Sequence, residues 1–286
     1  EVLTGGVRTE NGQSANMRTY PLVLLWASKY EETEASLPQD RVFAATESRQ
    51  PVVTARTGWG RQDHYLAVKG GYAKMSHAHM DAGSFCYDAY GVRWATDPVQ
   101  ESYAVLEKAM AGLGWGNLGQ YSQNSARWMA FRNNCRQHNT VCVNDKDHNV
   151  TAQALFILTH DTDSEIGGTL DLTATLAGEV ASATRKAVIK DGDHLSVTDR
   201  ITALSDKEAS VRWNICTEAH PTLADDGIIL ERDGIRMKLA VSASAGVKYR
   251  IWPNDPKQAE HPAPFCNVEA YRPEEYYCGY TVTVPA

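Results

Sequence analysis

Histidine and aspartate recur at every second position in the stretch at residues 76–85, which reads Ser-His-Ala-His-Met-Asp-Ala-Gly-Ser-Phe. If this stretch is an extended strand, the side chains of His77, His79 and Asp81 lie on one face. Three polar groups on one face are costly to bury unless they are satisfied together. The alternation therefore favours a metal site or a proton-transfer site. The alternative is two solvated histidines followed by an aspartate that forms a turn before Gly83.

Two later positions supply further candidate ligands. Asp97 follows a strand-like run at residues 92–96 and precedes a proline, which ends strand pairing. His138 stands at the entrance of the next strand-like run. Together with His79, these side chains make a set of two nitrogens and one oxygen that zinc accepts. Because the three residues are far apart in sequence, they meet only if adjacent strands bring them together.

The composition of the 286 residues narrows the class of protein. Lys and Arg number 28 against 35 Asp and Glu, and the net charge of −7 argues against a protein drawn to nucleic-acid phosphates. Residues 61–140 nevertheless hold a small excess of basic side chains, which suits an anionic substrate. The sequence lacks a run of about 18 apolar residues, so it predicts no membrane span. Six cysteines without a Cys-x-x-Cys pair argue against a zinc ribbon or a thioredoxin-type motif.

The N-terminal part of the sequence predicts a short helix. Pro21 fits a first helical turn, and residues 21–31 are apolar nearly all round. Such a short helix needs a packing partner, and we expect it to end a helical domain whose earlier part is missing. The chain begins at Glu1 without a Met or a signal peptide, which suggests a processed or truncated product. We therefore predict a helical tail and linker at residues 1–38 and a β domain at 39–286, the alternative being that the helix packs on that β domain.

From residue 41 onward the sequence changes to short apolar runs separated by turn residues, a pattern typical of strands. The runs lie at 42–45, 51–56, 65–69, 84–89, 92–96, 140–144, 154–159, 184–190, 195–201, 210–217, 228–232, 236–241, 247–252 and 277–284. The dipeptides Asp191-Gly192 and Asp233-Gly234 predict tight hairpins. Many short strands without alternating helices predict an all-β fold, a large antiparallel multi-stranded β-sandwich after the short helical segment.

A long segment at residues 98–132 interrupts the strands. It is rich in glycine and aromatic residues, a composition that predicts a functional loop and not plain disorder. The rings of Trp115 and Tyr121 could stack on sugar rings. The alternative is that most of these aromatic side chains anchor the loop to the core. Further histidines, including His148 and His160, are expected at the surface.

The stretch His77-Ala78-His79-Met80-Asp81-Ala82-Gly83-Ser84-Phe85, followed by Asp97-Pro98 and then by His138-Asn139-Thr140-Val141, resembles the C-terminal β domain of the heparinase II/III-like polysaccharide lyases. The resemblance extends over residues 40–284. In that family an α/α toroid precedes a large antiparallel β-sandwich, and the active site lies in the cleft between them. The resemblance implies that the helix at 21–31 is the tail of a toroid and that the missing toroid is a partner of this chain.

The resemblance also assigns roles to the polar residues. It implies that His77 is a catalytic histidine and that His79, Asp97 and His138 hold one structural zinc ion. Asp81 matches the motif without an implied role. The ligands would leave the zinc ion no open coordination position, and its role would be to fix the loop that carries His77.

The implied reaction is β-elimination at a uronic acid, in which the C5 proton is abstracted and the 4-linked sugar leaves. The substrate would be an acidic polysaccharide, such as a heparan-sulfate-like glycosaminoglycan, and we expect Trp115, Tyr121 and Arg136 to bind it. In the family the toroid supplies the usual tyrosine and the group that neutralises the carboxylate. We therefore expect half an active site here, little or no activity of the isolated chain, and a periplasmic or secreted parent protein.

Two other functions fit the same residues. One is a non-catalytic carbohydrate-binding or structural β-sandwich in which the zinc is purely architectural. The other is a metal-dependent hydrolase with an open zinc site, which would use a metal-bound water and give no double bond in the product.

Overall fold

A computed structural model describes residues 20–29, 36–98, 101–260, 263–264 and 266–286. The chain divides into two compact units, at residues 1–39 and 40–286. In the first unit the structure describes one helix, α1 (Tyr20–Ala27). This helix confirms the predicted one over most of its length, and residues 30 and 31 of the prediction lie outside the described residues.

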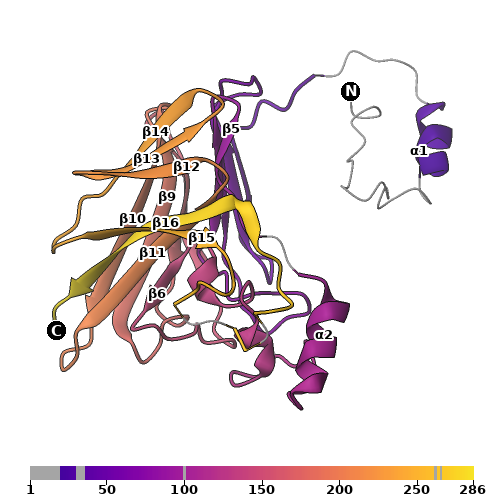
Figure 1. The fold of residues 1–286 in the computed structure, drawn as a ribbon. Coiled ribbons are helices and arrows are strands. Elements are labelled where there is room, and N and C mark those ends of the chain that lie inside the picture. The colour runs from indigo at the N-terminus through magenta and orange to yellow at the C-terminus, as the bar shows by residue number, and fades with distance from the viewer. Residues whose placement is uncertain (1–19, 30–35, 99–100, 261–262, 265) are drawn as a thin grey trace. The chain divides into compact units, whose positions relative to one another are not determined.

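The second unit consists mainly of antiparallel strands, which confirms the predicted all-β fold (Figure 1). The first sheet has the order β1 (Val42–Ala45), β2 (Val52–Arg56), β3 (Tyr65–Lys69), β4 (Phe85–Ala89), β5 (Val92–Ala95). The second has the order β10 (His194–Ala203), β9 (Val180–Lys190), β8 (Glu165–Asp171), β7 (Leu155–Asp161). The third has the order β15 (Lys248–Asn254), β16 (Arg272–Val284), β11 (Ala209–Thr217), β6 (Val141–Val143). The fourth has the order β12 (His220–Ala224), β13 (Gly227–Arg232), β14 (Ile235–Ala240).

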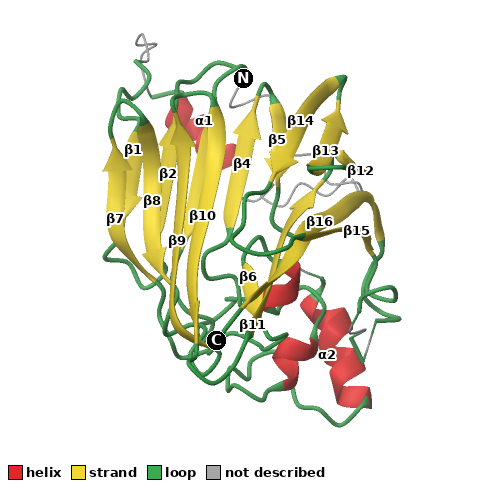
Figure 2. Cartoon of the chain, turned by 90° about the vertical axis from the view of Figure 1, so that its left-hand side faces the viewer, coloured by secondary structure: helices red, strands yellow, loops and turns green. Residues whose placement is uncertain are grey.

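The sheets form two facing layers with the core between them. Strands β2 and β3 of the first sheet contact β8 and β9 of the second, which faces the viewer in Figure 2. A β-bridge between Thr96 and Cys216 links the first sheet to the third. Alternation is visible along β3, where Leu66 and Val68 are buried while the neighbouring side chains are only partly covered. One face of β3 therefore fills the core, as expected of a strand in a sandwich.

Both predicted hairpin turns have the backbone that their sequences require. Asp191 and Gly192 have φ angles of 53° and 67°, and Asp233 and Gly234 have φ angles of 52° and 75°. Two successive positive φ values match the right-handed twist of the flanking strands. These tight turns connect β9 to β10 and β13 to β14.

The segment at residues 98–132 is not simply a loop, which corrects the prediction. It contains helix α2 (Tyr103–Gly112) and the short 3₁₀ helix η1 (Ala126–Met129), and a second 3₁₀ helix, η2 (Cys135–Gln137), follows the segment. Leu106 and Met110, four residues apart on one face of α2, are fully buried against Leu118. This helix lies with β6 at the lower end of the β unit in Figures 1 and 2.

Candidate functional site

The histidine motif adopts a turn and not a strand, because residues 72–84 are irregular and β4 begins only at Phe85. The expectation that His77, His79 and Asp81 share one face of a strand is therefore wrong. His77 has a φ of 64°, in the left-handed region that few non-glycine residues adopt. His77 is exposed and its ring neighbours Tyr103, whereas His79 is partly buried and its ring neighbours His138. The motif thus supplies two separate sites.

The first site surrounds His77. Its Nδ1 atom lies 3.2 Å from the hydroxyl oxygen of Tyr103, and the two rings stack with centroids 5.6 Å apart. The backbone N–H of His77 donates to the hydroxyl oxygen of Tyr121 at 3.1 Å. Tyr103 belongs to α2 and Tyr121 to the segment after it, so this predicted loop positions the histidine from two sides.

A buried arginine lies behind these three side chains. Arg127 donates from Nη2 to the carbonyl oxygen of Ala78 at 2.7 Å and, at 3.4 Å, to the hydroxyl of Tyr103. Its guanidinium carbon is 4.6 Å from the centre of the Tyr121 ring. The side chain is fully buried, and within the described residues it forms no ion pair. Its charge is therefore not cancelled locally and makes the surroundings of His77 attractive to anions.

The second site brings together the three residues predicted as zinc ligands. His138 Nδ1 lies 2.9 Å from Asp97 Oδ1, and the rings of His79 and His138 have centroids 5.2 Å apart. Burial and the neighbouring His138 lower the pKa of His79 to about 4, so its ring is neutral near pH 7. Although burial opposes it, Asp97 raises the pKa of His138, and that ring in turn lowers the pKa of the Asp97 carboxyl. The structure therefore places these three side chains next to one another.

The chemistry of these side chains suits zinc. Imidazoles and a carboxylate are donors that zinc accepts, and its binding would displace a proton from the His138 ring. The buried Nε2 atom of His138 has no hydrogen-bond partner among the described residues. Over the described residues, however, no three His, Cys, Asp or Glu side chains are arranged around a common metal position. In this arrangement Asp97 bonds to the His138 ring directly. The donor atoms are of the types that zinc binds, and the presence of a zinc ion stays a prediction.

Buried hydrogen bonds fix the segment at residues 138–140 against the motif. The Asn139 side chain donates to the carbonyl oxygens of Phe85 and Thr96, at 2.8 and 2.7 Å. Arg185, from β9, donates to the carbonyl oxygens of Gly83 and Asn139 and forms a bidentate pair with Asp199. These bonds connect three distant parts of the chain, and they explain how ligands far apart in sequence become neighbours.

The remaining candidates lie in different surroundings. Asp81 pairs with Lys69 at 2.5 Å, which gives it a local structural contact. Trp115 is partly buried against the cluster of Leu106. Arg136 is paired with Asp145 at 3.1 Å and with Asp147 at 2.5 Å, so both acids compete with a polysaccharide for its guanidinium.

His148 is buried, which makes the prediction of a surface position wrong. It is 2% exposed and its Nε2 atom lies 2.8 Å from the carbonyl oxygen of Val141. Burial lowers the pKa of His148 to about 4. It is therefore a neutral core histidine close to β6.

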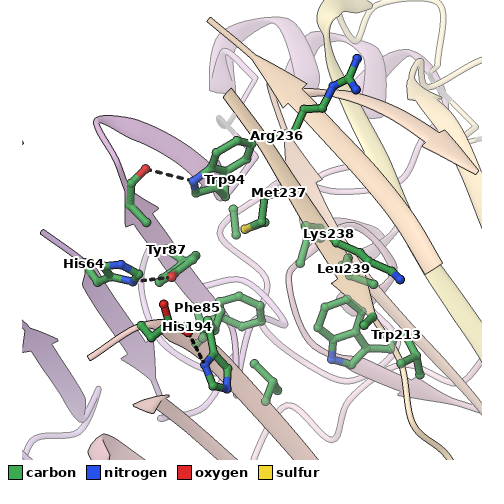
Figure 3. A pocket seen from close by; sticks show the side chains of 18 of the residues that line it. His64, Phe85, Tyr87, Trp94, His194, Trp213, Arg236, Met237, Lys238 and Leu239 are labelled. Atoms are coloured by element: carbon green, nitrogen blue, oxygen red, sulfur yellow. Dashed lines mark hydrogen bonds and ion pairs between the residues drawn. The ribbon is translucent and has the colours of Figure 1, made fainter. Parts of the chain in front are cut away.

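A separate aromatic pocket of about 260 Å³ lies among β4, β5, β10 and β14 (Figure 3). Trp94, Phe85 and Trp213 point into it, and at one side His64 Nδ1 lies 2.7 Å from the hydroxyl of Tyr87. None of the predicted catalytic or zinc residues lines this pocket. It is therefore distinct from the His77 site.

Glu269 anchors the segment that carries Arg127. Its carboxylate accepts the backbone N–H of Phe131 at 2.9 Å, and the residue is 5% exposed. Burial raises its pKa to about 7, above the ordinary value of 4.5. The folded state therefore binds a proton between these pH values that the unfolded chain has already released.

We expect this difference to lower the stability of the β domain as the pH rises from 4.5 to 7. The sign follows because the folded state binds more protons than the unfolded chain between these pH values. The free energy of unfolding falls by about 3 kcal/mol over this range. Glu269→Gln, which keeps an oxygen acceptor and cannot ionise, should flatten this part of the profile. Urea unfolding across the pH range measures the difference between the two proteins, and parallel profiles would contradict the prediction.

The antiparallel sandwich that carries the histidine motif matches a known family of protein domains. The family described as "Heparinase II/III-like, C-terminal" matches residues 47–263, which is more than half of the chain. The chain belongs to this family. No curated protein sequence matches it significantly.

The fold is similar to solved structures of heparinase III-type enzymes. The heparan sulfate lyase HepC from Pedobacter heparinus has a TM-score of 0.60 and 13% identity, over 93% of this chain and 38% of that one. A structure of heparinase III has a TM-score of 0.61 and 10% identity, over 88% of this chain and 37% of that one. The chain thus spans less than half the length of these proteins. The described part of the chain has no helix long and apolar enough to cross a membrane.

Proposed function

We propose that this chain is the β-sandwich part of a lyase that cleaves a uronic-acid-containing polysaccharide by β-elimination. The observation that supports this most directly is the group of His77, Tyr103, Tyr121 and Arg127, in which one tyrosine hydroxyl contacts the exposed imidazole and the other accepts the backbone N–H of His77, beside a buried cation. The remainder of the active site would come from a toroid domain in the parent protein.

In this proposal His77 acts as the base. We assign the proton of the neutral ring to Nδ1, which contacts the Tyr103 hydroxyl oxygen at 3.2 Å, and this tautomer leaves Nε2 to take the C5 proton of the uronic acid. The 4-linked sugar then leaves with the electron pair of its C4–O bond, and a C4–C5 double bond forms. Holding one ring nitrogen fixes both tautomer and orientation, which general base catalysis requires.

The positive charge of Arg127 supports an anionic substrate. Since the guanidinium is fully buried, it acts through its field and through the tyrosines, and does not touch the sugar. Negative charge develops on the uronate carboxylate as the proton leaves, and a fixed cation nearby lowers that cost. Trp115, Tyr121 and Arg136 stay candidate contacts to the polysaccharide.

We further propose that His79, Asp97 and His138 hold one zinc ion with a structural role. When bound, the zinc ion would link these three side chains through its coordination bonds. Because His79 is two residues from His77, that cross-link would hold the turn in which His77 has its left-handed backbone. The parent protein would be periplasmic or secreted, where such polysaccharides are met.

The test is to incubate the complete parent protein with heparan sulfate, chondroitin sulfate, hyaluronan and alginate. A lyase gives an unsaturated uronide, which absorbs in the ultraviolet. Cleavage without that absorbance would instead support a hydrolase. Binding without any cleavage would support the non-catalytic carbohydrate-binding sandwich, and either result overturns the proposal.

Tyr103→Phe tests the positioning of His77. Removing the hydroxyl removes the hydrogen bond to Nδ1 and leaves the stacked ring, so we expect kcat to fall by about tenfold. KM and the melting temperature should change little, because the hydroxyl is placed away from the sugar and Arg127, which donates to it at 3.4 Å, keeps its shorter hydrogen bond to the carbonyl oxygen of Ala78. Tyr271→Phe, at an exposed tyrosine, is the control, and equal kcat values for both variants would contradict this role.

A further inference from the structure

Two cysteines meet next to the segment that carries His138. The sulfur atoms of Cys135 and Cys142 are 3.1 Å apart, and both residues are almost fully buried. They pack in a small apolar cluster with Met80, Trp128 and Val150, separate from the main core. Cys135 opens η2 and Cys142 lies at the centre of β6, so the chain reverses between them.

We propose that Cys135 and Cys142 form a disulfide in the mature protein. The observed separation is only about 1 Å longer than a sulfur–sulfur bond, so closing it takes a small side-chain movement. The two thiols lose two protons and two electrons as the bond forms. The oxidant is a disulfide of a thiol oxidoreductase or of glutathione, which is itself reduced to two thiols. This inference does not depend on the lyase reaction.

The bond would close a short loop around the residues that assemble the zinc site. Within that loop, Asn139 bonds to the carbonyl oxygen of Phe85 and the Thr140 hydroxyl donates to that of Ala82. On the other side of the pair, the backbone N–H of Met80 donates to the carbonyl oxygen of Asn133. A covalent link at this point therefore fixes the position of the segment that carries His138 relative to the histidine motif.

The surroundings of the pair indicate when the bond forms. Burial raises the pKa of the Cys135 thiol well above its ordinary value, which suppresses the reactive thiolate in the folded protein. The disulfide would thus form as the chain folds, before the cluster closes. Once formed it is shielded from reductants, so its reduction should require denaturant.

Peptide mapping tests this directly, because Arg136 separates the two cysteines. The protein is produced in an oxidising compartment, free thiols are alkylated in denaturant, and the chain is cut with trypsin. Cleavage after Arg132, Arg136 and Lys146 yields the peptides 133–136 and 137–146. We expect them joined as one species that separates on reduction. Recovery of both as singly alkylated peptides, or of either joined to another cysteine, would overturn the proposal.

Stability gives a second readout. Reduction in denaturant followed by refolding should lower the melting temperature by about 5 °C, the loss expected for a short closed loop in a domain of this size. The Cys135→Ser, Cys142→Ser double variant should show no such dependence on reductant. Cys266→Ser, at a partly exposed cysteine, is the control that should behave as the wild type. The same reductant effect in the double variant would contradict the assignment.

Discussion

Replacing His77 should abolish elimination by the complete parent protein while leaving the fold intact. Loss of a positioned general base costs about 10³-fold in rate, and we expect His77→Ala to lower kcat by that factor. The side chain is exposed and, among the described residues, its ring bonds to the hydroxyl of Tyr103 and stacks on the ring of that tyrosine, so its removal leaves no buried group of this region unpaired. The measurements are the ultraviolet absorbance of the unsaturated product and the melting temperature of each protein.

The backbone of His77 requires a second variant. Its φ of 64° is costly for alanine, whereas asparagine tolerates the left-handed region. His77→Asn therefore removes the base without straining the turn and should be as inactive as His77→Ala. His220→Ala, at another exposed histidine, should keep full activity. Normal turnover by His77→Asn would exclude His77 as the base.

The parts of the fold that could be predicted from the sequence are those with local causes. Strand β3 was predicted at Tyr65–Lys69, its observed bounds, because alternating burial leaves a period of two in the sequence. The turns at Asp191 and Asp233 followed from dipeptides that accept positive φ angles. Both signals reside in a few neighbouring residues, so they need no knowledge of the rest of the chain.

The features that were missed depend on contacts between distant residues. Glycines at the end of α2 and after it hide the helical spacing of its apolar residues in the sequence. The helix is stabilised because Leu106 and Met110 pack on Leu118, which follows later in the chain. Strand β8 contains Gly167 and Gly168, which weaken a strand pattern although its neighbours β7 and β9 hold it in place.

The candidate site divides in the same way. The grouping of His79, Asp97 and His138 was predicted, but the turn that separates His77 from His79 was not, because it depends on the positive φ of His77 and on Tyr121. Tyr103 had no sequence signal for a role at the site. Arg127 was counted only as one basic residue among several. Its burial behind the tyrosines results from the packing of η1, which no local pattern encodes.

Removing His138 should cost both bound zinc and stability. Native protein should carry about one zinc per chain, and His138→Ala should carry none. The substitution also removes the hydrogen bond between the Asp97 carboxylate and the ring, leaving the one that the Ser84 hydroxyl donates, and opens a space where the ring was fully buried. We expect the free energy of unfolding to fall by about 1–3 kcal/mol for the lost hydrogen bond and the lost packing of the buried ring, with a further loss from the metal. His79→Ala should likewise lose zinc and stability.

A core histidine outside this group distinguishes loss of the metal from loss of packing. His148 is also buried and neutral, and its ring contacts the carbonyl oxygen of Val141. His148→Ala should therefore lower stability but keep its zinc, as measured by elemental analysis of the purified protein. A chelator should lower the melting temperature of the wild type and of His148→Ala, and leave that of His138→Ala unchanged. Zinc-free native protein, or a melting temperature of His138→Ala equal to that of His77→Ala, would reject a structural zinc at this position.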